Sequence, residues 1–93
     1  MMIITTMQDT IGRTPVFKFT NKDYPIPVNS AIYAKLEHLN PGGSVKDRLG
    51  QYLIEEGFKT GKITSKTTII EPTAGNTGIA LALVALKHHL KTI

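Results

Sequence analysis

The sequence contains no cysteine and no tryptophan among its 93 residues. Without cysteine, the chain has no disulfide, no thiolate metal site and no catalytic thiol, and it is compatible with a reducing compartment. Long apolar runs are also absent, since the longest, Ile79 to Leu86, is far too short to cross a bilayer. Met1 to Met7 lack the cationic lead and apolar stretch of a secretory signal. We therefore expect a soluble, cytoplasmic protein that does not associate with membranes.

Arginine-rich and aromatic-interleaved basic stretches are missing as well, although the net charge is +4. The lysines are spread along the chain, so we do not expect a nucleic-acid partner. The basic cluster from Lys87 to Lys91 lies where the last helix should end, and cations there complement the helix dipole. The histidines, His38, His88 and His89, show no metal-ligand spacing, and we expect no metal site.

The pattern of β-branched, apolar and turn residues predicts alternating strands and helices. We expect strands over residues 16–19, 31–36 and 67–70, and the onset of another at Lys91. A helix is expected from Ser44 to a glycine cap at Gly61, after a short helix near residues 5–9. A second long helix over residues 79–86 is apolar on every side, which is typical of a helix buried in a larger body. Tyr33, Tyr52 and the three phenylalanines are expected in the core.

The succession of strand, helix, strand, helix and strand onset is typical of an α/β fold with a parallel sheet and crossover helices. A parallel sheet is covered on both faces. A chain of 93 residues is too short to cover its own strands and a fully apolar helix. We therefore expect the N-terminal part of a larger enzyme, incomplete as a stand-alone domain.

One loop, Asn40-Pro41-Gly42-Gly43-Ser44-Val45-Lys46-Asp47-Arg48, delivers a lysine to the expected start of a helix. A turn before a helix needs no function, and Ser44 with Asp47 could form a capping box. That interpretation leaves Lys46 unexplained, because a helix N-terminus carries partial positive charge. An amine held near positive charge is suited to forming a Schiff base, so Lys46 is a candidate nucleophile. Arg48 is expected to pair with Asp47 or with a carboxylate across the fold.

The second loop, Glu71-Pro72-Thr73-Ala74-Gly75-Asn76-Thr77-Gly78, has the features of an anion site. Its glycines permit close backbone approach, and its N–H groups and hydroxyls at a helix start suit a carboxylate or a phosphate. It matches neither the Walker loop nor the dinucleotide fingerprint, and Asn76 could simply cap the helix. Loops that follow adjacent parallel strands converge on one crevice, so we expect Lys46 to face this loop. An imine-forming amine opposite a carboxylate-binding loop indicates amino-acid chemistry through a carbonyl cofactor, most simply pyridoxal phosphate.

Three motifs together resemble the family of cysteine synthase (O-acetylserine sulfhydrylase) and cystathionine β-synthase, which has the tryptophan-synthase-β fold. Pro41 to Arg48 matches the pyridoxal-lysine motif of that family. Glu71 to Gly78 matches its substrate loop, and Ile11 to Val16 resembles its Ile-Gly-x-Thr-Pro-Leu start. The resemblance covers the whole chain and implies the N-terminal part of a fold type II enzyme that depends on pyridoxal phosphate.

The resemblance implies a role for each candidate residue. Lys46 would carry pyridoxal phosphate on its amine and later move the α-proton, and Asn76 would hydrogen-bond the 3′ oxygen of the cofactor. The substrate would be bound by the second loop, through Thr73, Ala74, Gly75, Asn76 and Thr77. The implied reaction is β-replacement in cysteine biosynthesis, in which O-acetylserine loses acetate and sulfide adds to give cysteine.

Alternatives to this function stay open. Ala74 stands where the family usually has serine, as in relatives that resemble O-acetylserine-dependent cystathionine β-synthases, which favours homocysteine as a second acceptor. A truncated, non-catalytic module that keeps the motifs is an alternative of another class. Serine and threonine dehydratases of the same fold rank lower, because they usually carry Gly-Asn-His in place of Gly75-Asn76-Thr77.

The resemblance also implies how the protein is organised. Residues 1–40 would be an N-terminal segment whose strands pack on a larger domain, and residues 41–93 would begin a small α/β domain. The family's glycine-rich phosphate loop and its lid lie beyond residue 93, so we expect these residues alone to be inactive. The full-length enzyme is expected to be a homodimer, with serine acetyltransferase as a candidate partner.

Overall fold

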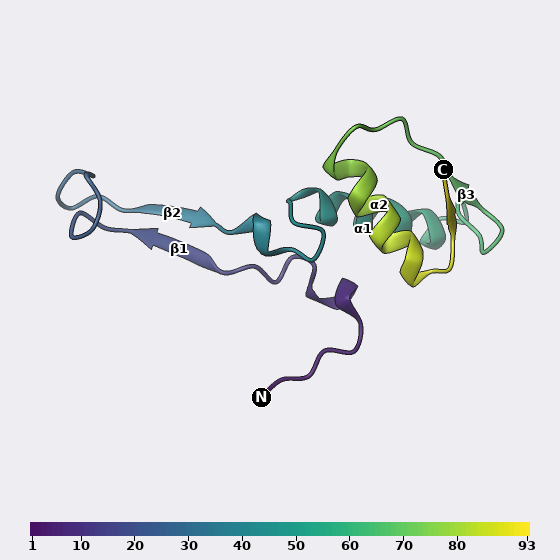
Figure 1. Ribbon diagram of the computed structural model, residues 1–93, viewed down its shortest axis with the longest axis horizontal. Helices are drawn as coiled ribbons and strands as arrows, with labels where there is room; N and C mark the ends of the chain where they lie inside the picture. Colours follow the sequence, from purple (N-terminus) through teal and green to yellow (C-terminus); the bar gives the residue numbers. More distant parts are fainter.

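The computed structural model describes residues 1–93 and shows two parts that extend in different directions (Figure 1). One part is a β-hairpin that projects from the rest of the molecule. The other part packs two α-helices against a pair of short strands. The principal extents of 56 × 35 × 22 Å reflect the length of the projecting hairpin. Both glycine-bearing loops lie in the helical part.

The hairpin pairs β1 (Val16–Phe19) with β2 (Ile32–Lys35) in antiparallel orientation. Val16 lies opposite Lys35, and Phe19 lies opposite Ile32. The strand predicted over residues 16–19 is confirmed, and the one predicted over 31–36 is shorter by a residue at each end. The expectation that this second strand enters the parallel sheet is wrong, because β2 bonds only to β1. The turn-rich loop between the two strands leads β2 directly back along its neighbour.

Aromatic side chains of the hairpin contact one another on its surface and do not fill a core. The ring centroids of Phe17 and Phe19 lie 4.8 Å apart, and those of Phe19 and Tyr24 lie 4.7 Å apart, both with the rings edge to face. Tyr33 is 64% exposed and Tyr52, on the first long helix, is 65% exposed. The prediction that Tyr33 and Tyr52 are core residues is therefore wrong, because nothing within residues 1–93 covers these faces.

A parallel β–α–β unit forms the C-terminal end of the chain, after α1. β3 (Thr68–Ile69) runs parallel to β4 (Lys91–Thr92), and α2 (Asn76–Lys87) crosses between them. The structure confirms the α/β class with a parallel sheet and a crossover helix, although each strand is only two residues long. None of the helices is both long and apolar enough to cross a bilayer.

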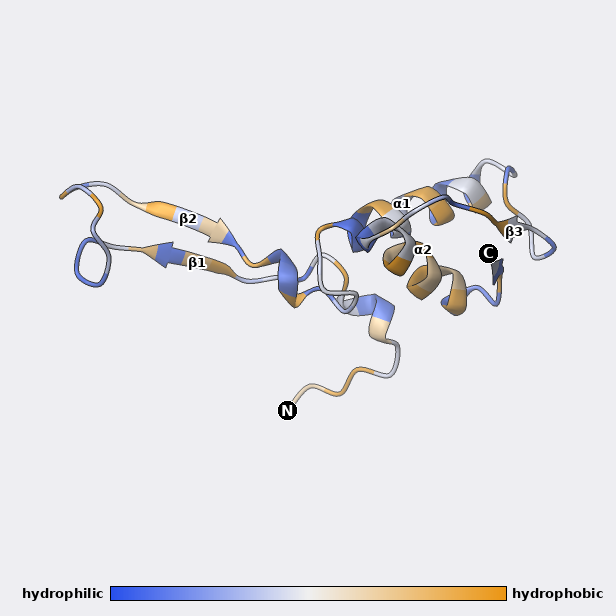
Figure 2. Cartoon of the chain, turned by 45° about the horizontal axis from the view of Figure 1, so that its top comes forward, coloured by the Kyte–Doolittle hydropathy of each residue, from blue (hydrophilic) through white to orange (hydrophobic).

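The core lies between α1 (Lys46–Lys59), α2 and the segments that flank them. Its buried apolar side chains are Ile11, Ile54, Leu81, Val84, Ala85 and Leu90. α2 also carries apolar residues on its uncovered side, where Ile79 is 52% and Leu86 is 69% exposed. Figure 2 shows this helix as hydrophobic along most of its length, as its sequence predicts. Gly61 has φ +76°, which confirms it as the glycine that ends α1.

The N-terminal segment contacts the helical part through side chains of η1 (Met7–Thr10), a short 3-10 helix. The Gln8 side chain donates a hydrogen bond of 2.7 Å to the carbonyl of Leu83 in α2. Lys87, at the end of α2, pairs with Asp9 at 3.1 Å. Residues before the hairpin therefore contact the β–α–β unit directly. The proposed division at residues 1–40 and 41–93 stays a prediction.

Gly50 sets the separation of the two long helices. A Cβ atom on Gly50 would lie 2.9 Å from the carbonyl carbon of Ala80 and 3.1 Å from its Cβ. Both residues are buried, and Ala80 is 0% exposed. Two small residues at this crossing let the helix backbones approach more closely than larger side chains would. The start of α1 and the start of α2 are thereby held close to each other.

We expect Gly50→Ala to destabilise the full-length natural protein by about 1–2 kcal/mol, because overpacking against rigid backbone outweighs the gain in helix propensity. Chemical denaturation measures the change. Glu55→Ala, on the exposed side of α1, is the matched control and should change stability by less than about 0.5 kcal/mol. Equal effects of the two substitutions would contradict a tight crossing at Gly50.

Candidate active site

Lys46 and Asn76 are the first residues of α1 and α2, and the helix crossing brings their sides together. Lys46 precedes Gly50 by four residues, and Asn76 precedes Ala80 by four residues. Residues four apart lie on the same face of a helix. The two side chains therefore lie on the facing sides of the helices, one turn before the contact. Figure 1 shows both helices beginning at the same end of the helical part.

The loop before Lys46 is held by Asp47, not by the predicted capping box. Asp47 is completely buried, and its Oδ2 accepts a hydrogen bond from the N–H of Gly42. A side chain on Gly42 would collide with this carboxylate, and Gly43 adopts φ +87°, which favours glycine. Ser44 accepts a hydrogen bond from the N–H of Lys46 at 3.1 Å, and the cap residue of α1 is Val45.

The Lys46 side chain is exposed and makes no hydrogen bond or ion pair within the chain. The backbone of Lys46, by contrast, is held by two hydrogen bonds. Asp47, the next residue, accepts from the N–H of Gly42, and the Ser44 hydroxyl accepts from the N–H of Lys46. The amine is thus free to react while the residue that carries it is held in place.

The Thr73 side chain holds the second loop against the start of α2 by hydrogen bonds. Its hydroxyl oxygen accepts hydrogen bonds from the N–H groups of Gly75 and Gly78, both at 3.2 Å. A side chain on Gly78 would collide with the methyl group of Thr73. The cap residue is Gly75, and Asn76 is already inside the helix. The suggestion that Asn76 caps the helix is therefore wrong.

Several donors of the second loop are left without an acceptor. The backbone N–H groups of Ala74, Asn76 and Thr77 make no hydrogen bond within the chain. The Thr73 hydroxyl accepts two bonds and keeps its own proton to donate. Free N–H groups at a helix N-terminus, together with the helix dipole, form a site for a carboxylate or a phosphate. The N–H of Gly75 already donates to the Thr73 hydroxyl, so it is not free for a ligand. Gly75 therefore contributes to the site only through its small size.

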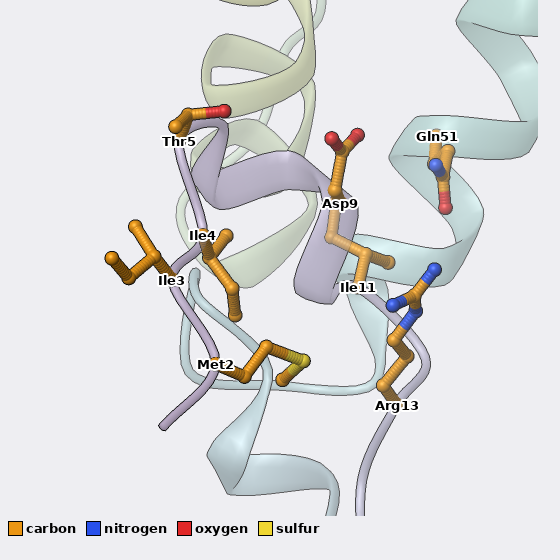
Figure 3. Close-up of a pocket in the computed structure, with 8 residues that line it drawn as sticks. All are labelled: Met2, Ile3, Ile4, Thr5, Asp9, Ile11, Arg13 and Gln51. Atoms are coloured by element: carbon orange, nitrogen blue, oxygen red, sulfur yellow. The ribbon is translucent and has the colours of Figure 1, made fainter.

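A recess of about 240 Å³ adjoins this loop, and its lining includes Glu71, Thr73 and Gly78. Another recess, of about 410 Å³, is lined by the N-terminal segment, Arg13 and Gln51 (Figure 3). Neither Lys46 nor the second loop lines that other recess. Lys46 does not line the recess beside Thr73 either, so this recess adjoins the second loop but does not reach the lysine.

A partly buried polar network centred on Glu37 reaches the first turn of α1 through Arg48. Arg48 donates to both Glu37 oxygens, at 2.8 and 2.9 Å, and Thr14 donates to Oε1 at 2.7 Å. Hydrogen bonds from Arg48, then from Thr14 and Asn40, hold the pKa of Glu37 far below its ordinary value of 4.5. The same pair raises the pKa of Arg48. The prediction that Arg48 pairs with a carboxylate across the fold is confirmed.

Sequence reasoning did not single out Glu37 or Asn40. Asn40 is 3% exposed, and its side chain links the N–H of Gly12 (2.8 Å) to the carbonyl of Ser44 (3.0 Å). Because these partners lie far apart in the chain, their contacts produce no periodic pattern in the sequence. The only indication of such a network in the sequence was Arg48, a charged residue without an assigned partner.

Comparisons with known proteins agree on one family. Residues 7–93 match the family described as pyridoxal-phosphate dependent enzyme. The chain is 96% identical over 93 residues to a cysteine synthase of Helicobacter pylori (strain ATCC 700392 / 26695), covering 100% of the chain and 30% of that protein. It is 52% identical over 93 residues to the O-acetylserine dependent cystathionine beta-synthase of Bacillus subtilis (strain 168), again covering 100% of the chain and 30% of the relative.

A solved structure gives the same result. The crystal structure of the O-acetylserine dependent cystathionine beta-synthase from Helicobacter pylori superposes with a TM-score of 0.91 at 96% sequence identity. The match covers 99% of this chain and 30% of that one. The chain therefore spans about 30% of the length of the relatives that it matches.

The Glu37 network should stabilise the protein at neutral pH and lose its effect in acid. Because the folded pKa of Glu37 is lowered, its contribution is complete above the ordinary value of 4.5 and declines as the pH falls below it. We expect the difference in Tm between the natural protein and Glu37→Gln to be constant from about pH 8 to about pH 6 and to narrow below about pH 4.5. A difference that grows in acid would contradict this assignment.

Proposed function

The chain belongs to the family of pyridoxal-phosphate-dependent enzymes that includes cysteine synthases and cystathionine β-synthases, and from this we propose a β-replacement function. The chain carries the cofactor lysine and the substrate loop of an enzyme that replaces the acetoxy group of O-acetylserine with a thiol. The observation that supports this most is a free Lys46 amine at the start of α1 together with unpartnered N–H donors of the second loop at the start of α2.

The side chains at this site fit the cofactor. An aldehyde group needs an accessible amine, and Lys46 is exposed and free of ion pairs. Asn76, on the facing side of α2, supplies an amide that can hydrogen-bond the 3′ oxygen of a ring held at Lys46. When bound, pyridoxal phosphate supplies an electron sink for the loss of the α-proton and of the β-substituent.

The second loop binds and orients the amino acid. The N–H groups of Ala74, Asn76 and Thr77 and the hydroxyl proton of Thr73 converge at the start of α2. An α-carboxylate held by them would fix one end of the substrate. The Lys46 amine would be the group that accepts the α-proton. Gly75 keeps the approach to these donors open, because nothing lies within 4 Å of where its Cβ would be.

Sulfide is the proposed acceptor, and the product is then cysteine. A second candidate acceptor is homocysteine, which would give cystathionine. It is supported by Ala74, which leaves a backbone donor but no hydroxyl at its position, and by the names of the relatives from Bacillus subtilis and Helicobacter pylori. A methyl group in place of a hydroxymethyl group leaves more room beside the carboxylate for a larger thiol.

We also propose that residues 1–40 pack on parts of the full-length protein outside these 93 residues. The hairpin supports this, because Val16, Ile32 and Tyr33 are all more than half exposed. Exposed apolar residues on a two-stranded sheet leave it only marginally stable alone. The relatives are about three times as long as the matched segment, which provides chain to cover this face.

The full-length natural protein, loaded with pyridoxal phosphate, should convert O-acetylserine and sulfide to cysteine, and Lys46→Ala should lower kcat by at least about 1000-fold. Lys66→Ala, which removes another exposed lysine, is the matched control and should retain activity. Replacing sulfide with homocysteine and assaying cystathionine measures the choice of acceptor. Turnover that survives in Lys46→Ala would overturn the role of Lys46, and no turnover in the loaded natural protein would overturn the proposal in favour of a non-catalytic module.

A further inference from the structure

The Glu37 network joins three segments that the proposed function leaves without a role. Thr14 comes from the motif at residues 11–16, Glu37 and Lys35 come from the end of the hairpin, and Arg48 comes from the first turn of α1. The Arg48 guanidinium also donates to the carbonyl of Gly12 at 3.0 Å. An arginine bonded to both carboxylate oxygens has its orientation fixed as well as its position.

The same carboxylate controls the loop before Lys46. Oε2 of Glu37 accepts a hydrogen bond of 2.8 Å from the Asn40 side chain. That amide also donates to the carbonyl of Ser44 at 3.0 Å, while the carbonyl of Asn40 accepts from the N–H of Gly43 at 2.8 Å. Glu37 therefore reaches the backbone on one side of Lys46 through Asn40, and the helix on its other side through Arg48.

The backbone at the start of α1 sets the region that the Lys46 amine can reach. The amine sits on a flexible four-carbon stem, so the position of its Cα limits where the nitrogen can lie. No side-chain contact holds the Lys46 amine within the chain. Its placement opposite the second loop must come from the first turn of α1 and from the loop before it.

We propose that Glu37 is a positioning residue for the Lys46 amine, acting through Arg48 and Asn40 on the start of α1. The inference rests on the proposed function, in which Lys46 carries the cofactor. Glu37 touches neither Lys46 nor the second loop in the hydrogen bonds it makes. It is thus distinct from the residues that bind substrate or cofactor.

The test compares Glu37→Gln with Asp9→Asn in the full-length natural protein. Asp9 forms the ion pair with Lys87 at 3.1 Å, which links η1 to α2 without touching α1. Each substitution neutralises the carboxylate of an ion pair, Glu37 with Arg48 or Asp9 with Lys87, so both can lower Tm. We expect only Glu37→Gln to lower kcat, by about 10- to 100-fold, with the KM for O-acetylserine changed by less than about 3-fold.

Two further readouts do not depend on turnover. The fraction of Lys46 labelled by borohydride in the presence of pyridoxal phosphate should fall in Glu37→Gln and not in Asp9→Asn. Amide hydrogen exchange at residues 46–49 of the cofactor-free protein should become faster in Glu37→Gln, with no change at residues 54–59. Arg48→Lys keeps a cation beside Glu37 but loses the paired geometry, so it should show a smaller effect of the same kind.

A lower Tm with no change in the other readouts would overturn the inference. If Glu37→Gln and Asp9→Asn lower Tm while labelling, kcat and amide exchange stay as in the natural protein, Glu37 only stabilises the fold. Should Glu37→Gln fail to fold, Arg48→Lys decides the question by the same readouts. If Lys46 of the natural protein is never labelled, the proposed function fails, and amide exchange at residues 46–49 still shows whether Glu37 orders the start of α1.

Discussion

The close approach of α1 and α2 at Gly50 and Ala80 is the constraint on which the rest of the site depends. Because neither residue carries a large side chain, the backbones meet one turn after the start of each helix. Two loops that are separate in the sequence lead directly into these two helices. A larger residue at either position would push the helices apart and separate Lys46 from the donors of the second loop.

Charge at the start of α1 shows how the fold accommodates a lysine there. The helix dipole disfavours Lys46 and favours a carboxylate, and Asp47 is buried directly beside it. Asp47 accepts from Gly42 through Oδ2, while its Oδ1 is buried without a partner within the chain. The carboxylate at this position compensates for an amine that the helix alone would not favour, and it shapes the loop at the same time.

The sequence was sufficient to predict the elements whose cause is local. The strand over residues 16–19, the glycine cap at Gly61 and the start of helices after both loops follow from β-branched runs and turn residues. Lys46 was singled out because a lysine is unfavourable at a helix N-terminus, and the second loop because its glycines and hydroxyls suit an anion at a helix start. The family comparisons confirm the assignment that these motifs indicated.

Features that depend on distant contacts could not be predicted in the same way. The antiparallel pairing of β2 with β1, the capping of α2 by Thr73 and the link from Glu37 to Arg48 each require the folded chain. The tyrosines were misassigned because aromatic residues usually lie in a core, whereas Tyr33 belongs to an uncovered sheet. Hydrophobicity predicts that a residue will be covered, and it does not say by which part of a protein.

Borohydride trapping tests the central claim, that Lys46 carries the cofactor, most directly. The full-length natural protein is incubated with pyridoxal phosphate and reduced, and the labelled peptide is then identified by mass. The account predicts that the label lies on Lys46 and that the cofactor's absorbance band shifts when O-acetylserine is added before reduction. Label scattered over exposed lysines such as Lys59 and Lys66, with no dominant peptide, would contradict it.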